Sequence, residues 1–169
     1  MLPNVFIRPG ELRNAEWAEF DLAGGMWRFP AGRMKMKNPH AVPLATQVRE
    51  LLYDLQELTG TGRLLFPGRR SKDRPISAVT LTAGLRRMGF STEEICPHGF
   101  RTTASTPLNE KGYPADWIER QLALRERNGV RAAYNRAEWL QERIRMTQEW
   151  PDCLDGLKAE WPLRGLSWP

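Results

Sequence analysis

Three residues of this sequence have side chains that could act together on a small anion: His98, Arg101 and Tyr134. His98 and Arg101 are three positions apart, and residues at this spacing lie on one face of a helix. An imidazole and a guanidinium on one face can bind the same small anion, and a tyrosine hydroxyl can form a covalent intermediate. A His-x-x-Arg pair also occurs by chance in many helices, so the elements around it decide whether it has a function.

The composition is that of a globular protein with an excess of positive charge. The 169 residues fit one domain, and 41% hydrophobic and 27% charged residues are ordinary values. The net charge of +5 and the pI of about 9.6 permit an anionic partner. Cys96 and Cys153 match no metal-ligand spacing and no disulfide framework, which favours a cytoplasmic location. No apolar run is long enough to span a bilayer and no export signal is evident, so we expect no membrane partner.

The first part of the chain predicts short strands between helices. A helix is expected over Pro9–Trp17, with Pro9 in its first turn. Strands are expected over residues 20–22, 26–30 and 40–44, with Gly24-Gly25 as a tight hairpin turn. Apolar residues then recur at helical spacing, and we expect them all to be buried: Val48, Leu51, Leu52, Leu55 and Leu58.

The second part predicts four helices. The first follows Ser77 and buries Leu81, Leu85 and Met88, and the central one starts near His98. Pro107 lies inside the central helix, where it either kinks the helix or places its start later. The third helix covers residues 114–124, and the last covers residues 137–157, where Pro151 breaks or kinks it. We expect the apolar residues around and after this proline to pack on their own domain or on a second copy of the chain: Trp150, Leu154, Leu157 and Trp161.

Basic residues are concentrated in one part of the chain. Seven positive charges and one negative charge lie between Arg63 and Arg87, whereas residues 138–160 are net acidic. Such a concentration is typical of a DNA-facing surface. The turn between the second and third strands is also basic, and it is either a solvated loop or a basic finger along a phosphate backbone. The candidate DNA-binding residues are Arg33, Lys37, Arg69, Arg70 and Lys72.

Taken in order, the motifs resemble the catalytic domain of the tyrosine recombinases, in particular the phage and prophage integrases. The motifs are Arg8-Pro9-Gly10-Glu11-Leu12, Met34-Lys35 ahead of Val42-Pro43-Leu44, His98-Gly99-Phe100-Arg101, and Tyr134-Asn135-Arg136. The resemblance runs over about residues 6–157. It implies an α+β fold that is mainly α-helical, with a small three-stranded antiparallel sheet near the N-terminus. We interpret residues 1–169 as this domain, cut at its N-terminal end, with the arm-binding and core-binding domains of the family absent.

The resemblance implies a role for each site residue. Arg8 and Arg101 resemble the two arginines that hold the non-bridging oxygens of the scissile phosphate, which a planar, permanently charged guanidinium suits. Lys35 resembles the hairpin lysine that protonates the departing 5′ oxygen. His98 resembles the histidine that helps to move the nucleophile's proton, and Tyr134 resembles the nucleophile that forms a 3′-phosphotyrosyl link. The link conserves the energy of the cleaved bond, so the resemblance implies no cofactor and no metal.

Two positions leave alternatives open. Lys37 takes the role of Lys35 if the register of the hairpin is shifted. Leu124 stands where the family usually has a histidine or tryptophan that donates a hydrogen bond to the phosphate, and leucine has no donor. The chain is therefore either a site-specific recombinase for prophage integration and excision, or a catalytically impaired DNA-binding or oligomerising remnant of one. A type IB topoisomerase would share the chemistry, but the motifs favour an integrase. The expected partners are double-stranded DNA with attachment sites and a second copy of the chain on that DNA.

Overall fold

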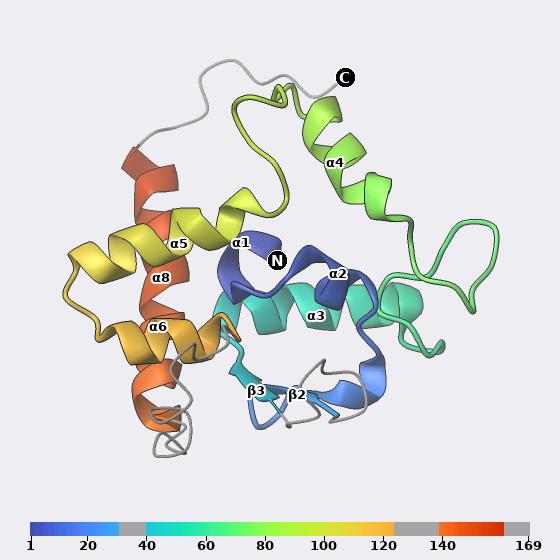
Figure 1. Cartoon of the computed structure of the whole chain (residues 1–169). Coiled ribbons are helices and arrows are strands. Elements are labelled where there is room, and N and C mark those ends of the chain that lie inside the picture. The colour runs from blue at the N-terminus through green and yellow to red at the C-terminus, as the bar shows by residue number, and fades with distance from the viewer. Residues whose placement is uncertain (31–39, 124–138, 161–169) are drawn as a thin grey trace, which may run out of the picture.

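A small sheet lies at one edge of a set of helices in the computed structural model, which describes residues 1–30, 40–123 and 139–160 (Figure 1). The elements in chain order are α1 (Leu2–Val5), α2 (Pro9–Arg13), the 3₁₀ helix η1 (Trp17–Glu19), β1 (Phe20–Asp21), β2 (Met26–Phe29), β3 (His40–Pro43), α3 (Thr46–Thr59), α4 (Ala78–Arg87), α5 (Gly99–Glu110), α6 (Ala115–Gln121) and α8 (Leu140–Glu160). The mainly helical α+β fold predicted from the sequence is confirmed.

The three strands form an antiparallel sheet in the order β1-β2-β3. Trp27 of β2 pairs with Phe20 on one side and with Val42 on the other. Gly25 has a φ of 65°, in the left-handed region that glycine tolerates best, and it allows the tight turn between β1 and β2. All three predicted strands are present, and each ends one residue earlier than predicted.

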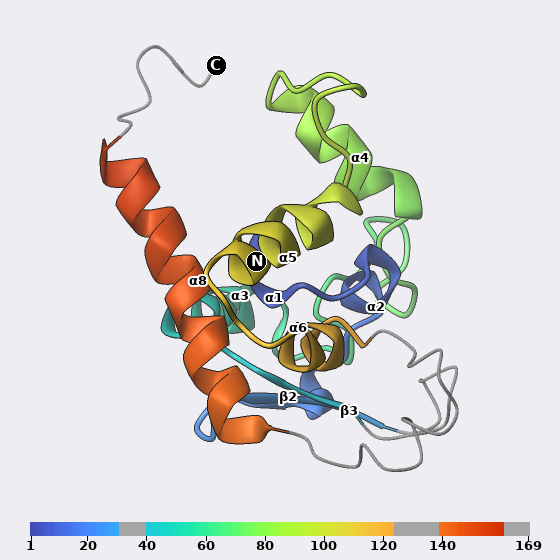
Figure 2. The ribbon, with the colours of Figure 1, turned by 60° about the vertical axis from the view of Figure 1, so that its left-hand side comes forward.

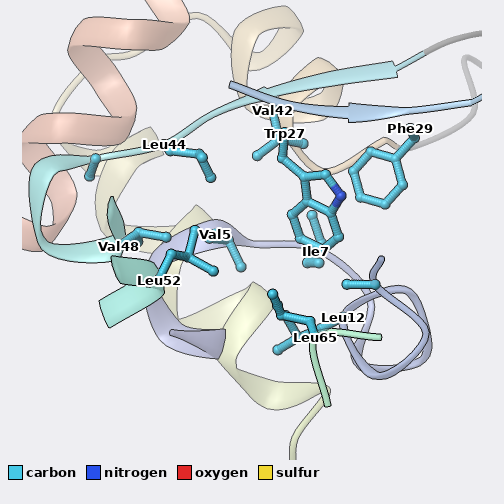
Figure 3. Close-up of a cluster of buried hydrophobic side chains, with 12 residues drawn as sticks. Val5, Ile7, Leu12, Trp27, Phe29, Val42, Leu44, Val48, Leu52 and Leu65 are labelled. Carbon is cyan, nitrogen blue, oxygen red and sulfur yellow. The ribbon is translucent and has the colours of Figure 1, made fainter. Parts of the chain in front are cut away.

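The first hydrophobic cluster lies between the sheet, α3 and the start of the chain, with Trp27 and Ile7 close together (Figure 3). The buried Trp27 ring stacks on Phe20 and Phe29, at ring-centroid distances of 4.7 and 4.3 Å. Its indole N–H donates to Glu19 Oε2 at 3.0 Å, so the ring is buried without an unpaired donor. This cluster anchors the segment that leads into Arg8.

Only one stripe of α3 faces this cluster. Val48 and Leu52 are fully buried and Leu55 is partly buried, at the i, i+4 and i+7 positions of one face. Leu51 and Leu58 are 46% and 80% exposed, so the prediction that all five residues are buried is wrong for these two. They lie on one flank of the buried stripe, which the described elements leave uncovered.

The second hydrophobic cluster joins the start of the chain to α5, α6 and α8, which lie together in Figure 2. The Phe6 ring packs edge-on against Trp150, with ring centroids 6.2 Å apart. Trp150 Nε1 also donates to Pro3 O at 3.0 Å. Trp150 and Leu154 therefore pack on their own domain, whereas Leu157 is exposed and Trp161 lies outside the described residues.

Several predicted helix features are wrong. The helix that starts at Pro9 ends at Arg13, because Asn14 leaves the helical conformation and its side chain binds Gly10 O at 2.6 Å. The helix of residues 114–124 is shorter, since α6 ends at Gln121. Met88, predicted to be buried, is exposed.

Both described helices that have a proline in their interior, α5 and α8, continue past it. The last helix runs through the buried Pro151 to Glu160, so this proline does not break it (Figure 2). The central helix starts at Gly99 and contains Pro107, so the predicted alternative of a later start is wrong.

Candidate functional site

A hollow of about 340 Å³ between α2, α5 and the end of α6 receives three of the predicted site residues. Its lining residues are Arg8, His98, Arg101, Thr102, Ser105 and Leu122. A second hollow of about 710 Å³ shares Arg8 and His98 and extends toward Glu16 and Arg63. Two arginines and a histidine from distant segments therefore meet at one place.

Arg8 is held by the start of α2. It is the N-cap residue with an extended backbone, and Pro9 begins the helix behind it. Glu11 Oε2 accepts a hydrogen bond from the Arg8 backbone N–H at 3.1 Å, and Glu11 Oε1 pairs with Arg8 Nη1 at 3.1 Å. Arg8 Nη2 donates to Ala123 O at 3.2 Å. The side chain is still 43% exposed, so its charge remains accessible from the hollow.

Arg101 is buried in the first turn of α5, with a relative exposure of 6%. Its Nη1 donates to Phe6 O, and its Nη2 donates to Leu122 O at 2.7 Å. Burial lowers the pKa of Arg101 to about 10, with the nearby Arg8 charge acting in the same direction and Glu11 opposing the shift. The guanidinium stays charged at neutral pH. A guanidinium has five N–H donors, so two bonds to backbone carbonyls are compatible with paired bonds to an anion.

His98 occupies the N-cap position of α5 and is exposed at both hollows. Its carbonyl accepts a hydrogen bond from the Arg101 backbone N–H at 3.2 Å. The loop before it is held by Arg86, which donates to Phe90 O, Ser91 O and Ile95 O. The predicted spacing of His98 and Arg101 thus brings both side chains to the same hollow.

The other predicted site residues fall into two groups. Five of them lie outside the described residues: Arg33, Lys35, Lys37, Leu124 and Tyr134. Three are exposed in the segment between α3 and α4 and line neither of the two hollows: Arg69, Arg70 and Lys72.

Sequence reasoning missed a buried polar group on the other side of α6. Arg143 of α8 is fully buried, and its Nε and Nη2 donate to Gln121 Oε1 at 3.1 and 2.8 Å. Arg143 Nη2 also donates to Ala41 O in β3. The helical spacing of the sequence could have indicated this burial, because Arg143 falls on the same helical stripe as the buried Met146 and Trp150.

His40 lies beside this group at the start of β3, with a relative exposure of 4%. Burial and the charges of Arg143 and Arg120 lower the pKa of His40 to about 3, although a hydrogen bond to the Gln121 backbone opposes the shift. The ring is therefore neutral at pH 7, unlike a histidine that binds an anion as a cation.

Among residues 1–30, 40–123 and 139–160, no group of three or more His, Cys, Asp or Glu side chains is arranged to hold a metal ion. In this part of the chain, no helix has both the length and the apolar character needed to cross a bilayer.

Comparison with known proteins identifies the family to which the chain belongs. Residues 2–139 match the model of the phage integrase family. The chain belongs to the phage integrase family. This integrase-family chain is 46% identical over 166 residues to the integrase of Enterobacteria phage P4 and 41% identical over 150 residues to the prophage integrase IntA of Escherichia coli K12. Both alignments cover 89% of the chain, which spans 38% and 36% of the length of these relatives.

A solved structure supports the fold of this integrase-family chain. The crystal structure of XerA recombinase matches with a TM-score of 0.61 at 17% identity, over 97% of this chain and 55% of that one. The resemblance to tyrosine recombinases drawn from the motifs is therefore confirmed by the sequence relatives, and the fold by a solved structure.

Proposed function

We propose that this chain breaks and rejoins DNA strands through Tyr134, in site-specific recombination for prophage integration and excision. The observation that supports this function most directly is the meeting of Arg8, His98 and Arg101 at one hollow. A DNA phosphodiester carries one negative charge, and charge-assisted hydrogen bonds from guanidinium groups are the strong ones. The phage integrase relatives support the same reaction.

The proposed reaction consumes no nucleotide, because each bond that breaks is replaced by a bond of the same kind. The Tyr134 oxygen attacks the phosphorus, the bond from phosphorus to the 5′ oxygen breaks, and His98 helps to move the tyrosine proton. Lys35, or Lys37 in the shifted register, protonates the 5′ oxygen. Arg8 and Arg101 stabilise the charge that grows on the non-bridging oxygens. Rejoining is the reverse attack of a 5′ hydroxyl on the phosphotyrosyl link.

The alternative function is DNA binding without efficient cleavage, and Leu124 favours it. Leucine cannot donate a hydrogen bond where the family usually has histidine or tryptophan. Loss of one preorganised donor costs about 10²–10³ in rate in another class of site, or roughly 3–4 kcal/mol. Such a site would be slow but not inactive.

Covalent capture on a nicked duplex tests both functions. In saturating DNA at low salt, the unchanged chain should form little covalent adduct, and Leu124→His should increase the adduct at least about tenfold. Tyr134→Phe in the Leu124→His background should abolish the adduct, whereas Tyr53→Phe on the exposed face of α3 should not change it. An adduct that still forms in Tyr134→Phe would contradict the assignment of Tyr134 as the nucleophile. No gain from Leu124→His would leave DNA binding as the favoured function.

Duplex binding should be weak, tolerant of sequence and strongly salt-dependent, because released counterions drive it. Replacement of Arg69, Arg70 and Lys72 by alanine should reduce the slope of log affinity against log salt by about 0.9 for each phosphate that is no longer neutralised. Lys158→Ala at the net acidic end of α8 is the matched control and should leave the slope unchanged. An affinity that does not change between low and moderate salt would contradict DNA as the partner.

Self-association is the second proposed partnership. Leu157 is exposed near the end of α8, a helix that extends beyond α5 in Figure 2. Light scattering should give a larger mass for the unchanged chain than for Leu157→Glu. Identical monomer masses for the two chains would contradict self-association.

A further inference from the structure

The end of α6 binds three arginines in succession. Each of three consecutive residues accepts hydrogen bonds from a different one: the Gln121 side chain from Arg143, the Leu122 carbonyl from Arg101, and the Ala123 carbonyl from Arg8. Two of these arginines line the hollow proposed to bind phosphate, and the third lies in the core. The end of α6 therefore connects the candidate site to the interior.

The chemistry of a helix end explains the attraction. Leu122 is the C-cap residue of α6 and Ala123 follows it, so their carbonyls have no donor within the helix and lie at its partly negative end. Ala123 has a φ of 49°, a left-handed conformation that is uncommon for residues other than glycine. The direction of the Leu122 and Ala123 carbonyls thus depends on a backbone conformation that needs support from its surroundings.

Arg143 and Gln121 supply that support. Both residues are fully buried, and the two bonds between them join α8 to the last residue of α6. The third bond of Arg143, to Ala41 O, extends the connection to β3. A helix end tied to two other elements, α8 and β3, has little freedom to tilt, so the carbonyl oxygens that hold the two hollow-lining arginines have little freedom either.

We propose that Arg143 and Gln121 are positioning residues for the phosphate site. They fix the end of α6, whose carbonyls aim the guanidinium groups of Arg101 and Arg8 at one anion, and they do not touch the substrate. The inference rests on the proposed function, since it gives the pair a role at the same site. A pair that only packs the core would contribute to stability without changing how the hollow binds an anion.

Titration with inorganic phosphate tests this role without DNA cleavage. The probe is the side-chain ¹⁵N–¹H signals of Arg8 and Arg101 in the full chain, assigned with Arg8→Lys and Arg101→Lys. Gln121→Met has a similar volume but no acceptor, and it should shift the Arg101 signal and weaken phosphate binding at least fivefold. Gln121→Glu keeps the acceptor and should stay within about twofold of the unchanged chain.

The matched control is Gln148→Met. Gln148 lies on α8 like Arg143 but binds Thr46 and Gln47 at the start of α3. It should leave phosphate binding unchanged. Unchanged binding in Gln121→Met, or an equal loss in Gln148→Met, would overturn the inference. If Gln121→Met does not fold, Arg143→Lys takes its place, because it keeps the charge without the planar fork, and unchanged binding there has the same meaning.

Covalent capture in the Leu124→His background separates this inference from the proposed function. Gln121→Met should lower the adduct rate at saturating DNA at least tenfold, but less than about threefold when Arg101→Lys is also present, because most of the effect passes through Arg101. Fully additive losses would indicate a purely structural role and overturn the inference. Absence of a Tyr134-dependent adduct when Gln121 is intact would instead refute the proposed function, and the phosphate titration would still be informative.

Discussion

The two sides of the end of α6 carry the same residue types in opposite surroundings. Arg101 and His98 line the hollow, whereas Arg143 and His40 are sealed in the core on the other side. His98 is exposed at the hollow, and His40 is buried and neutral at pH 7. The difference shows that residue type alone does not mark a site for an anion. Access to a hollow separates the arginine that can bind an anion from the one that holds the fold.

The energetic consequences of the two sides should differ as well. Removing one partner of a buried hydrogen bond leaves the other partner without a bond and is destabilising. Changes on the core side should therefore appear first in the free energy of unfolding. Changes on the hollow side should appear first in the rate of DNA cleavage, because the hollow-lining groups act on charge that develops in the transition state.

The largest expected effect is on the core side. Arg143→Met should lower the free energy of unfolding by about 2–6 kcal/mol, because two buried acceptors, Gln121 Oε1 and Ala41 O, lose their donor at about 1–3 kcal/mol each. Urea denaturation measures it. The matched variant Arg145→Met, at an exposed position of the same helix, should change stability by less than about 0.5 kcal/mol. Equal losses in the two variants would contradict the comparison.

Arg101→Lys should have its main effect on the hollow side. Lysine keeps the charge but lacks the planar fork, so adduct formation in the Leu124→His background should fall about 10²–10³-fold, roughly 3–4 kcal/mol in the barrier. The destabilisation should be smaller than that of Arg143→Met. Single-turnover cleavage measures the effect, with the exposed Arg28→Lys of β2 as the control. A similar loss of cleavage rate in Arg28→Lys would contradict the assignment of Arg101 to the phosphate site.

Acid should distinguish the two histidines. The pKa of His40 is about 3 in the folded state, below the ordinary value of 6.5, so the unfolded chain binds the proton first as the pH falls. The stability due to neutral His40 is complete above about pH 6.5 and is lost progressively down to about pH 3. The loss is about 1.4 kcal/mol per pH unit, or roughly 2–3 kcal/mol at pH 4.5.

Denaturation at pH 7 and pH 4.5 measures this difference. His40→Phe should show a smaller loss of unfolding free energy between pH 7 and pH 4.5, because the contribution of His40 is gone. His98→Gln should show the same loss as the unchanged chain. An unchanged acid loss in His40→Phe would mean that the carboxylates alone determine it.

The smallest expected effect concerns α5, which carries Arg101. Pro107 lies inside this helix and has no N–H for the Thr103 carbonyl. Pro107→Leu should restore that bond and raise the free energy of unfolding by about 1 kcal/mol, with cleavage unchanged, since the site is about two turns away. A scan of the melting temperature checks the direction. A lower melting temperature would show that the local backbone is already adapted to proline.

Local rules account for what the sequence predicts. The Gly24-Gly25 turn and the alternation around it locate the strands to within one residue, and the motifs bring Arg8, His98 and Arg101 together. Interactions between distant elements account for the errors. Leu58 is exposed because the described elements leave that flank of α3 uncovered. Arg143 escaped notice because its burial depends on how α8 packs on α6 and β3, which helical periodicity does not specify.

The bond from the Trp150 indole to Pro3 O joins residues 147 positions apart. A chain that emerges from the ribosome from its N-terminus exposes Phe6 long before Trp150 exists to cover it. Interactions of such sequence separation slow folding, because a long loop must close before they form. The second cluster can thus assemble only after Trp150 has been synthesised. Until then Phe6 is an exposed apolar side chain, and a nascent chain of this kind is a natural client for chaperones.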